Sequence, residues 1–195
     1  MSDRSLGARS SWRVCHGDVC ERADMVKGKW AAGICPRNFT WVMKDSFAVS
    51  ERPGGFAPNH RRVRRQEEII WLRVQGFDRV ISLLPSPHNL HAYDEGELVW
   101  AHYPLPTATD PRSVLEDCYT DLRNSLAEGQ RVLMHQEELG DRVMGVVAGF
   151  LVWSGRLPTN PQAVAMVEHM IGRQMGPAGR ELVVVVNGPA PRRAG

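Results

Sequence analysis

The most constraining feature of this sequence is a short apolar segment that leads, through a few mostly polar residues, into a longer apolar segment. Residues 131–135 have the length and composition of a buried strand, and residues 142–153 have those of a buried helix. Residues 136–141 between them predict a loop. A buried strand followed at once by a helix is the repeating unit of parallel α/β sheets, so this segment favours an α/β fold.

The rest of the chain continues this alternation of short apolar runs with longer helical patterns. The clearest helix opens at Asp110–Pro111, a capping residue followed by proline at the first helical position, and ends at Gly129. Residues 182–186 could form an edge strand or an apolar tail. The expected strands are 39–42, 46–49, 79–84, 98–103 and 131–135, and the expected helices are 59–75, 110–129, 142–153 and 160–174.

The sequence divides into three parts. Residues 1–37 show little apolar periodicity and predict an N-terminal extension, residues 38–180 predict one α/β domain, and residues 181–195 predict a tail or edge strand. The formal charge of +2 is too balanced for nucleic-acid or membrane binding through the overall field. The chain has neither a membrane-length apolar run nor a secretion signal, which favours a cytoplasmic protein. Its richness in Arg, Ala and Gly suits a high-GC bacterium.

A group of cysteines and a histidine near the start of the chain is a weak sequence signal for a zinc site. Cys15, His16, Cys20 and Cys35 are residue types that bind tetrahedral zinc. However, the first two are adjacent, which strains simultaneous ligation, and no Cys-x-x-Cys spacing is present. We therefore expect surface or packed thiols, with no metal and no cofactor.

The loop at 136–141 is the strongest candidate for a binding site. A loop between a buried strand and a helix directs backbone N–H groups and the positive end of the helix toward one point, which favours an oxyanion. Arg142 could bind two oxygens of such an anion through its guanidinium. Alternatively, Arg142 could pair with a nearby carboxylate, Glu137, Glu138 or Asp141, and only hold the loop in place.

At this point the sequence resembles the cysteine-dependent tyrosine and dual-specificity phosphatases, particularly their small atypical members. That family places His-Cys, five residues and Arg on its strand, loop and helix, and this chain has His135–Gln136, residues 137–141 and Arg142. The segment 38–42, Asn-Phe-Thr-Trp-Val, resembles an Asn-Phe-Ser-Trp-Val opening of the small members. The resemblance implies a mostly parallel central sheet flanked by helices. It also implies a ligand-binding loop that comprises His135, Leu139, Gly140, Asp141 and Arg142, in which His135 orders the loop by hydrogen bonding.

The sequence departs from this family at the residues that carry the chemistry. The family attacks phosphorus with a thiolate, whereas the amide of Gln136 is not a nucleophile. Leu139 and Asp141 stand where glycines are usual, and Val143 stands where a hydroxyl residue is usual. The expected general acid aligns with Leu105. Asp110 lies near enough to replace that acid, although capping the helix that follows is its favoured role.

Two hypotheses of different classes follow. In the first, the chain is a pseudophosphatase that has lost its thiol chemistry and binds a protein partner or a small anionic ligand through the remodelled loop. In the second, Gln136, Glu137, Glu138 or nearby histidines perform acid–base chemistry on a small molecule, without a phosphocysteine intermediate. The sequence leaves open whether the chain is an enzyme.

Overall fold

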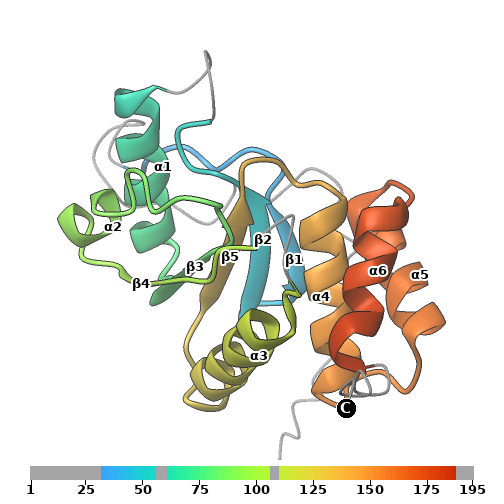
Figure 1. Ribbon diagram of the computed structural model, residues 1–195. Helices are drawn as coiled ribbons and strands as arrows, with labels where there is room; N and C mark the ends of the chain where they lie inside the picture. Colours follow the sequence, from blue (N-terminus) through green and yellow to red (C-terminus); the bar gives the residue numbers. More distant parts are fainter. Residues whose placement is uncertain (1–31, 56–60, 106–109, 188–195) are drawn as a thin grey trace, which may run out of the picture. The chain divides into compact units, whose positions relative to one another are not determined.

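The computed structural model describes residues 32–55, 61–105 and 110–187 (Figure 1). Its centre is a five-stranded sheet in the order β1-β2-β5-β3-β4. Only β1 is antiparallel to its neighbour, so the predicted mostly parallel α/β sheet is confirmed. The strands are β1 (Thr40–Met43), β2 (Phe47–Glu51), β3 (Arg79–Ser82), β4 (Val99–His102) and β5 (Val132–Gln136).

The strand β5 lies in the middle of the sheet, between β2 and β3. Ser50 of β2 and Ser82 of β3 are both in register with His135, and Glu51 is in register with Gln136. Because the three strands are parallel, their carboxyl ends meet at one edge of the sheet. Gln136 therefore ends the central strand where the loops that follow β2 and β3 also begin.

Helices cover both faces of the sheet, as the alternation of side chains along β5 requires. Val132 and Met134 pack into one apolar core with α3, α4, α5 and α6, while Leu133 packs into a second core with α1 and α2. Figure 1 shows α1 and α2 apart from the other helices, on the far side of the sheet. The helices are α1 (Arg62–Val74), α2 (Ala92–Glu95), α3 (Arg112–Ala127), α4 (Asp141–Trp153), α5 (Asn160–Ile171) and α6 (Pro177–Asn187).

The helix α4 is the centre of the larger core, and two of its glycines allow neighbours to approach closely. A side chain at Gly145 would overlap the backbone of Gly179 in α6. One turn later, a side chain at Gly149 would overlap the hydroxyl of Tyr119 in α3, which donates a 3.0 Å hydrogen bond to the Val146 carbonyl. The first contact brings the backbone of α6 against α4, and the second seats the Tyr119 side chain of α3 on α4.

The prediction of an edge strand or tail at residues 182–186 was wrong, because these residues lie inside α6. Their valines favour strands, but Leu182 and Val183 are buried against α4 while Val184 is exposed, as on one face of a helix. Packing against α4 therefore overrides the local preference.

Two smaller differences concern helix boundaries. The helix α3 begins at Arg112, so Pro111 lies in the capping position rather than the first helical position, and the carboxylate of Asp110 accepts a 3.0 Å hydrogen bond from the Arg112 backbone N–H. The short helix α2 falls between the expected strands 79–84 and 98–103, among residues not assigned to any expected helix or strand. In the part of the chain that the structure describes, no helix is both long and apolar enough to cross a membrane.

The contact between α4 and α6 yields a prediction in which two effects have opposite signs. Helix propensity alone would make Gly145→Ala stabilising by about 1 kcal/mol. We expect instead a loss of about 1–3 kcal/mol, because the added methyl group meets the Gly179 backbone, which cannot rotate away. Urea denaturation of the two proteins measures the difference. A variant as stable as the parent would contradict the close approach of α6.

Candidate functional site

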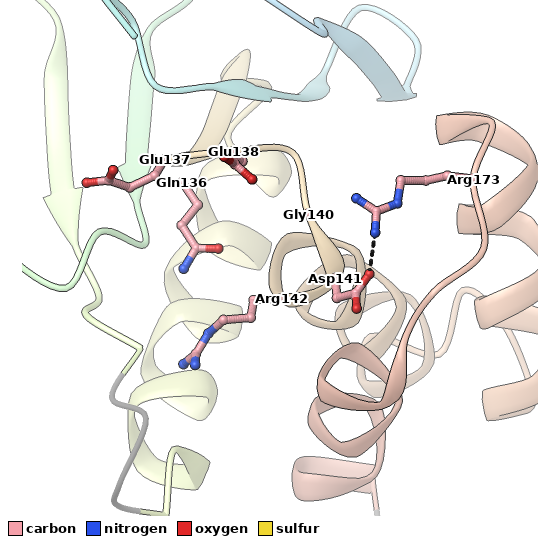
Figure 2. Close-up of a pocket in the computed structure, with 7 residues that line it drawn as sticks. All are labelled: Gln136, Glu137, Glu138, Gly140, Asp141, Arg142 and Arg173. Carbon is pink, nitrogen blue, oxygen red and sulfur yellow. Dashed lines mark hydrogen bonds and ion pairs between the residues drawn. The ribbon is translucent and has the colours of Figure 1, made fainter. Parts of the chain in front are cut away.

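The candidate site is the loop between β5 and α4, where the structure forms a pocket of about 390 Å³ (Figure 2). Gly140 caps α4 in an extended conformation, and Asp141 and Arg142 are the first two residues of the helix. The loop therefore lies at the positive end of α4, as predicted. The residues that line the pocket are Gln136, Glu137, Glu138, Gly140, Asp141, Arg142 and Arg173.

Below the loop, His135 is completely buried and is not among the pocket-lining residues. Its Nε2 lies 2.9 Å from the hydroxyl oxygen of Tyr93 in α2, a hydrogen bond that ties the end of β5 to the helix behind it. Burial, together with the positive charge of Arg52, lowers the pKa of His135 to about 3. Burial also raises the pKa of Tyr93 above its usual range. Both side chains are therefore neutral near pH 7.

The loop is anchored to the core by apolar side chains. Leu139 is only 7% exposed, and it packs in the same core as the fully buried Val143 of α4. The side chain of Leu139 therefore points into the protein and does not line the pocket, although the sequence placed it among the ligand-contacting residues. Its neighbour Gly140 does line the pocket.

Glu137 is held aside by Arg52, the residue that follows β2. The two side chains form an ion pair at 3.4 Å, and Arg52 also donates a 2.8 Å hydrogen bond to the carbonyl of His88. The side chain of Arg52 thus joins the loops that follow β2, β3 and β5. Figure 2 shows the Glu137 carboxylate directed away from the Gln136 amide, and Glu138 is exposed to solvent.

On the opposite side of the loop, Asp141 forms an ion pair with Arg173. The distance from Oδ1 to the guanidinium is 2.7 Å, and Arg173 lies in the connection between α5 and α6 (Figure 2). A side chain at Gly176 would overlap the Asp141 carboxylate, so this connection packs tightly against the first turn of α4. A carboxylate in that turn also interacts favourably with the helix dipole.

Arg142 extends to the other side of α4 from Arg173. Its Nη2 donates a 2.9 Å hydrogen bond to the carbonyl of Leu105, just after β4. Leu105 itself is buried in the core, and its hydrocarbon side chain has no ionisable group for proton transfer. Asp110, the other candidate acid, is exposed, its carboxylate accepts a hydrogen bond from the Arg112 backbone N–H at the start of α3, and it is not among the residues that line the pocket.

The charges around the pocket are balanced. Glu137, Glu138 and Asp141 contribute three carboxylates, while Arg142, Arg173 and the adjacent Arg52 contribute three guanidiniums. Such a site can hold an anionic group by hydrogen bonds, but its summed charge does not attract a dianion strongly. Arg52 and Arg173 were not among the site residues predicted from the sequence. No local pattern marks them, because each reaches the loop only through the tertiary fold.

The residues that the structure describes do not form a metal site. Within residues 32–55, 61–105 and 110–187, no group of three or more His, Cys, Asp or Glu side chains could hold a metal ion. Cys35 is exposed, whereas Cys15, His16 and Cys20 lie outside the described residues. The zinc alternative therefore stays a prediction.

Solved structures show which known proteins share this fold. The kinase associated phosphatase, in a form with its catalytic-site cysteine replaced by serine, matches with a TM-score of 0.64 and 17% identity, over 76% of this chain and 92% of that one. The active form of Tk-PTP matches with a TM-score of 0.61 and 19% identity, over 78% and 98%. Human DUSP28 matches with a TM-score of 0.56 and 14% identity, over 78% and 94%. No protein-family model and no curated protein matches the sequence.

These similarities extend over most of both chains, so the protein has the fold of the dual-specificity and tyrosine phosphatases. The predicted phosphatase-like sheet with flanking helices is thereby confirmed. Because the sequence identities are below 20%, these structural similarities establish the fold alone. The activity has to be argued from the site itself.

The buried His135 leads to a prediction about acid stability. In the unfolded chain this side chain takes up a proton near pH 6.5, whereas in the folded chain it stays neutral down to about pH 3. The folded state therefore has its full stability above pH 6.5 and loses roughly 1 kcal/mol per pH unit as the pH falls from there toward 3. Urea denaturation across this pH range should show that dependence of the unfolding free energy on pH in the unaltered chain. The dependence should be weaker in His135→Gln. Equal slopes for the two proteins would contradict the prediction, and above pH 7 their curves should run parallel.

Proposed function

We propose that this protein is a pseudophosphatase: a phosphatase-fold domain without thiol chemistry that binds an anionic group of a protein partner or small ligand in the pocket between β5 and α4. The observation that carries the proposal is the position of Gln136. It ends the central strand at the pocket, and Arg142 follows in the first turn of α4. In the resembling phosphatases, that place on the strand belongs to the nucleophilic cysteine.

Gln136 removes the covalent step of phosphatase chemistry. A thiolate displaces the leaving group and forms a phosphocysteine, whereas the nitrogen of an amide is delocalised into its carbonyl and does not attack phosphorus. The amide retains two N–H donors and one acceptor oxygen. In Figure 2 this amide extends from the loop toward the side on which Arg142 lies, so both offer donors there. This arrangement supports binding of an oxygen-bearing anion.

The directions of the two glutamates favour binding over acid–base catalysis. A general acid or base must reach the reacting group within hydrogen-bond distance, and it works best in a sheltered position. Glu137 is instead paired with Arg52, and Glu138 is exposed at the rim. No histidine is among the described residues that line the pocket, and His135 is buried below the loop. The alternative of a repurposed enzyme therefore has less support from the described residues.

The first prediction of this proposal concerns activity. We expect the unaltered chain to hydrolyse p-nitrophenyl phosphate no faster than a protein-free blank, because no thiolate is available at position 136. A spectrophotometric assay over pH 5–8 measures this, with an active phosphatase of the same fold as positive control. Turnover that grows in proportion to the concentration of this chain and that disappears in Arg142→Met would refute the proposal.

The second prediction concerns binding. We expect benzoate, a simple carboxylate probe, to shift the amide resonances of residues 136–142 in a ¹H–¹⁵N spectrum, and Arg142→Met to weaken this binding about tenfold through loss of a charged donor. Arg156→Met is the matched control, since Arg156 is exposed and does not line the pocket. Equal binding by the two variants would mean that the anion lies elsewhere. Thermal unfolding of both variants verifies that they are folded.

A further inference from the structure

We propose that Asp141 is a specificity-determining residue: it serves as the pocket's own anion on Arg173 and makes the pocket favour a singly charged carboxylate over a phosphate dianion. This inference rests on the proposed function, because it concerns which anionic group the pocket accepts. It adds Arg173 and Asp141 as the residues that decide the charge of the ligand.

The geometry holds Asp141 on Arg173. The 2.7 Å ion pair joins the first residue of α4 to the connection between α5 and α6. Packing against Gly176 limits where the carboxylate can move, since any side chain there would overlap it. Asp141 is about three-quarters buried, with a side-chain exposure of 26%, so solvent screens its charge only in part. A negative charge is therefore fixed beside the positive end of α4.

This resident carboxylate already lies on the Arg173 guanidinium, one of the groups that would stabilise an incoming oxyanion. The N–H groups of the first turn and the Arg173 guanidinium both favour a negative charge, and Asp141 already supplies one. A ligand that needs Arg173 must compete with an ion pair inside the protein. A ligand that uses Gln136 and Arg142 instead feels the Asp141 charge across the pocket.

The charge balance indicates which ligand tolerates this arrangement. With three carboxylates and three guanidiniums around the pocket, a monoanion adds one uncompensated charge and a phosphate dianion adds two. The repulsion from Asp141 is therefore twice as large for the dianion. A carboxylate, such as an acidic side chain or chain end of a partner, fits this balance better than a phosphomonoester.

The experiment compares two probes that share a benzene ring and differ in charge: benzoate and phenyl phosphate at pH 8. Each is titrated into the full chain at constant ionic strength, and the amide shifts of residues 136–142 give the dissociation constants. The variants are Asp141→Asn and Glu138→Gln. Both remove one negative charge from the pocket lining, but only the first releases Arg173. Asp141→Ser is a second variant, suited to a helix start.

We expect the unaltered chain to bind benzoate at least as tightly as phenyl phosphate. In Asp141→Asn, phenyl phosphate should bind about tenfold more tightly than in the unaltered chain, with a smaller gain in Glu138→Gln. Adding Arg173→Gln to Asp141→Asn should abolish the gain, because the released guanidinium would no longer be present.

Four outcomes would overturn the inference. Preference of the unaltered chain for phenyl phosphate, or equal gains in Asp141→Asn and Glu138→Gln, would refute the role of Asp141 while leaving an anion-binding pocket in place. If phenyl phosphate still bound more tightly after Arg173→Gln was added to Asp141→Asn, the Arg173 guanidinium would not be the group that Asp141→Asn releases. Failure of both probes to shift the loop amides in every folded variant would instead refute the proposed function, and the inference with it.

Discussion

The structure depends on the burial of β5 at the centre of a parallel sheet. Hydrogen bonding to β2 on one side and β3 on the other fixes where the strand stops, and apolar contacts on both faces fix its rotation. The first turn of α4 is then placed within a few residues of the strand end, and Leu139 and Val143 anchor the turn from below. The position of Gln136 is thus a result of sheet packing. Whatever the loop binds, it binds on a rigid support.

Around this support, the polar side chains are arranged in pairs. Arg52 holds Glu137 on one side of the loop and Arg173 holds Asp141 on the other. Each pair satisfies a carboxylate that would otherwise repel an anion, and each also occupies an arginine that would otherwise attract one. A shared fold does not fix such pairs, so similarity to phosphatases leaves the ligand to be argued from the loop.

Much of the fold was predictable from the sequence, because its secondary structure follows apolar runs. The strand at 131–135 and the helix at 142–153 are confirmed nearly to the residue. The prediction of an edge strand or tail at 182–186 was wrong, since the helical form of these valines depends on contact with α4. The sequence predicted which residues form the loop, but it did not predict that the Leu139 side chain points into the core. Arg52 and Arg173 were missed because they lie 85 and 32 positions from their partners in the chain.

Arg173 follows α5 in the chain, and this position limits where the protein can be truncated. The loop at the end of β5 is complete by Arg142, but its second guanidinium comes from a later segment, and the contact between Gly145 and Gly179 keeps α6 against α4 beside that segment. A fragment ending at α5 would retain the central strand and the acidic side chains but lose this counter-charge. The smallest unit with the complete pocket therefore includes α6, near the end of the chain.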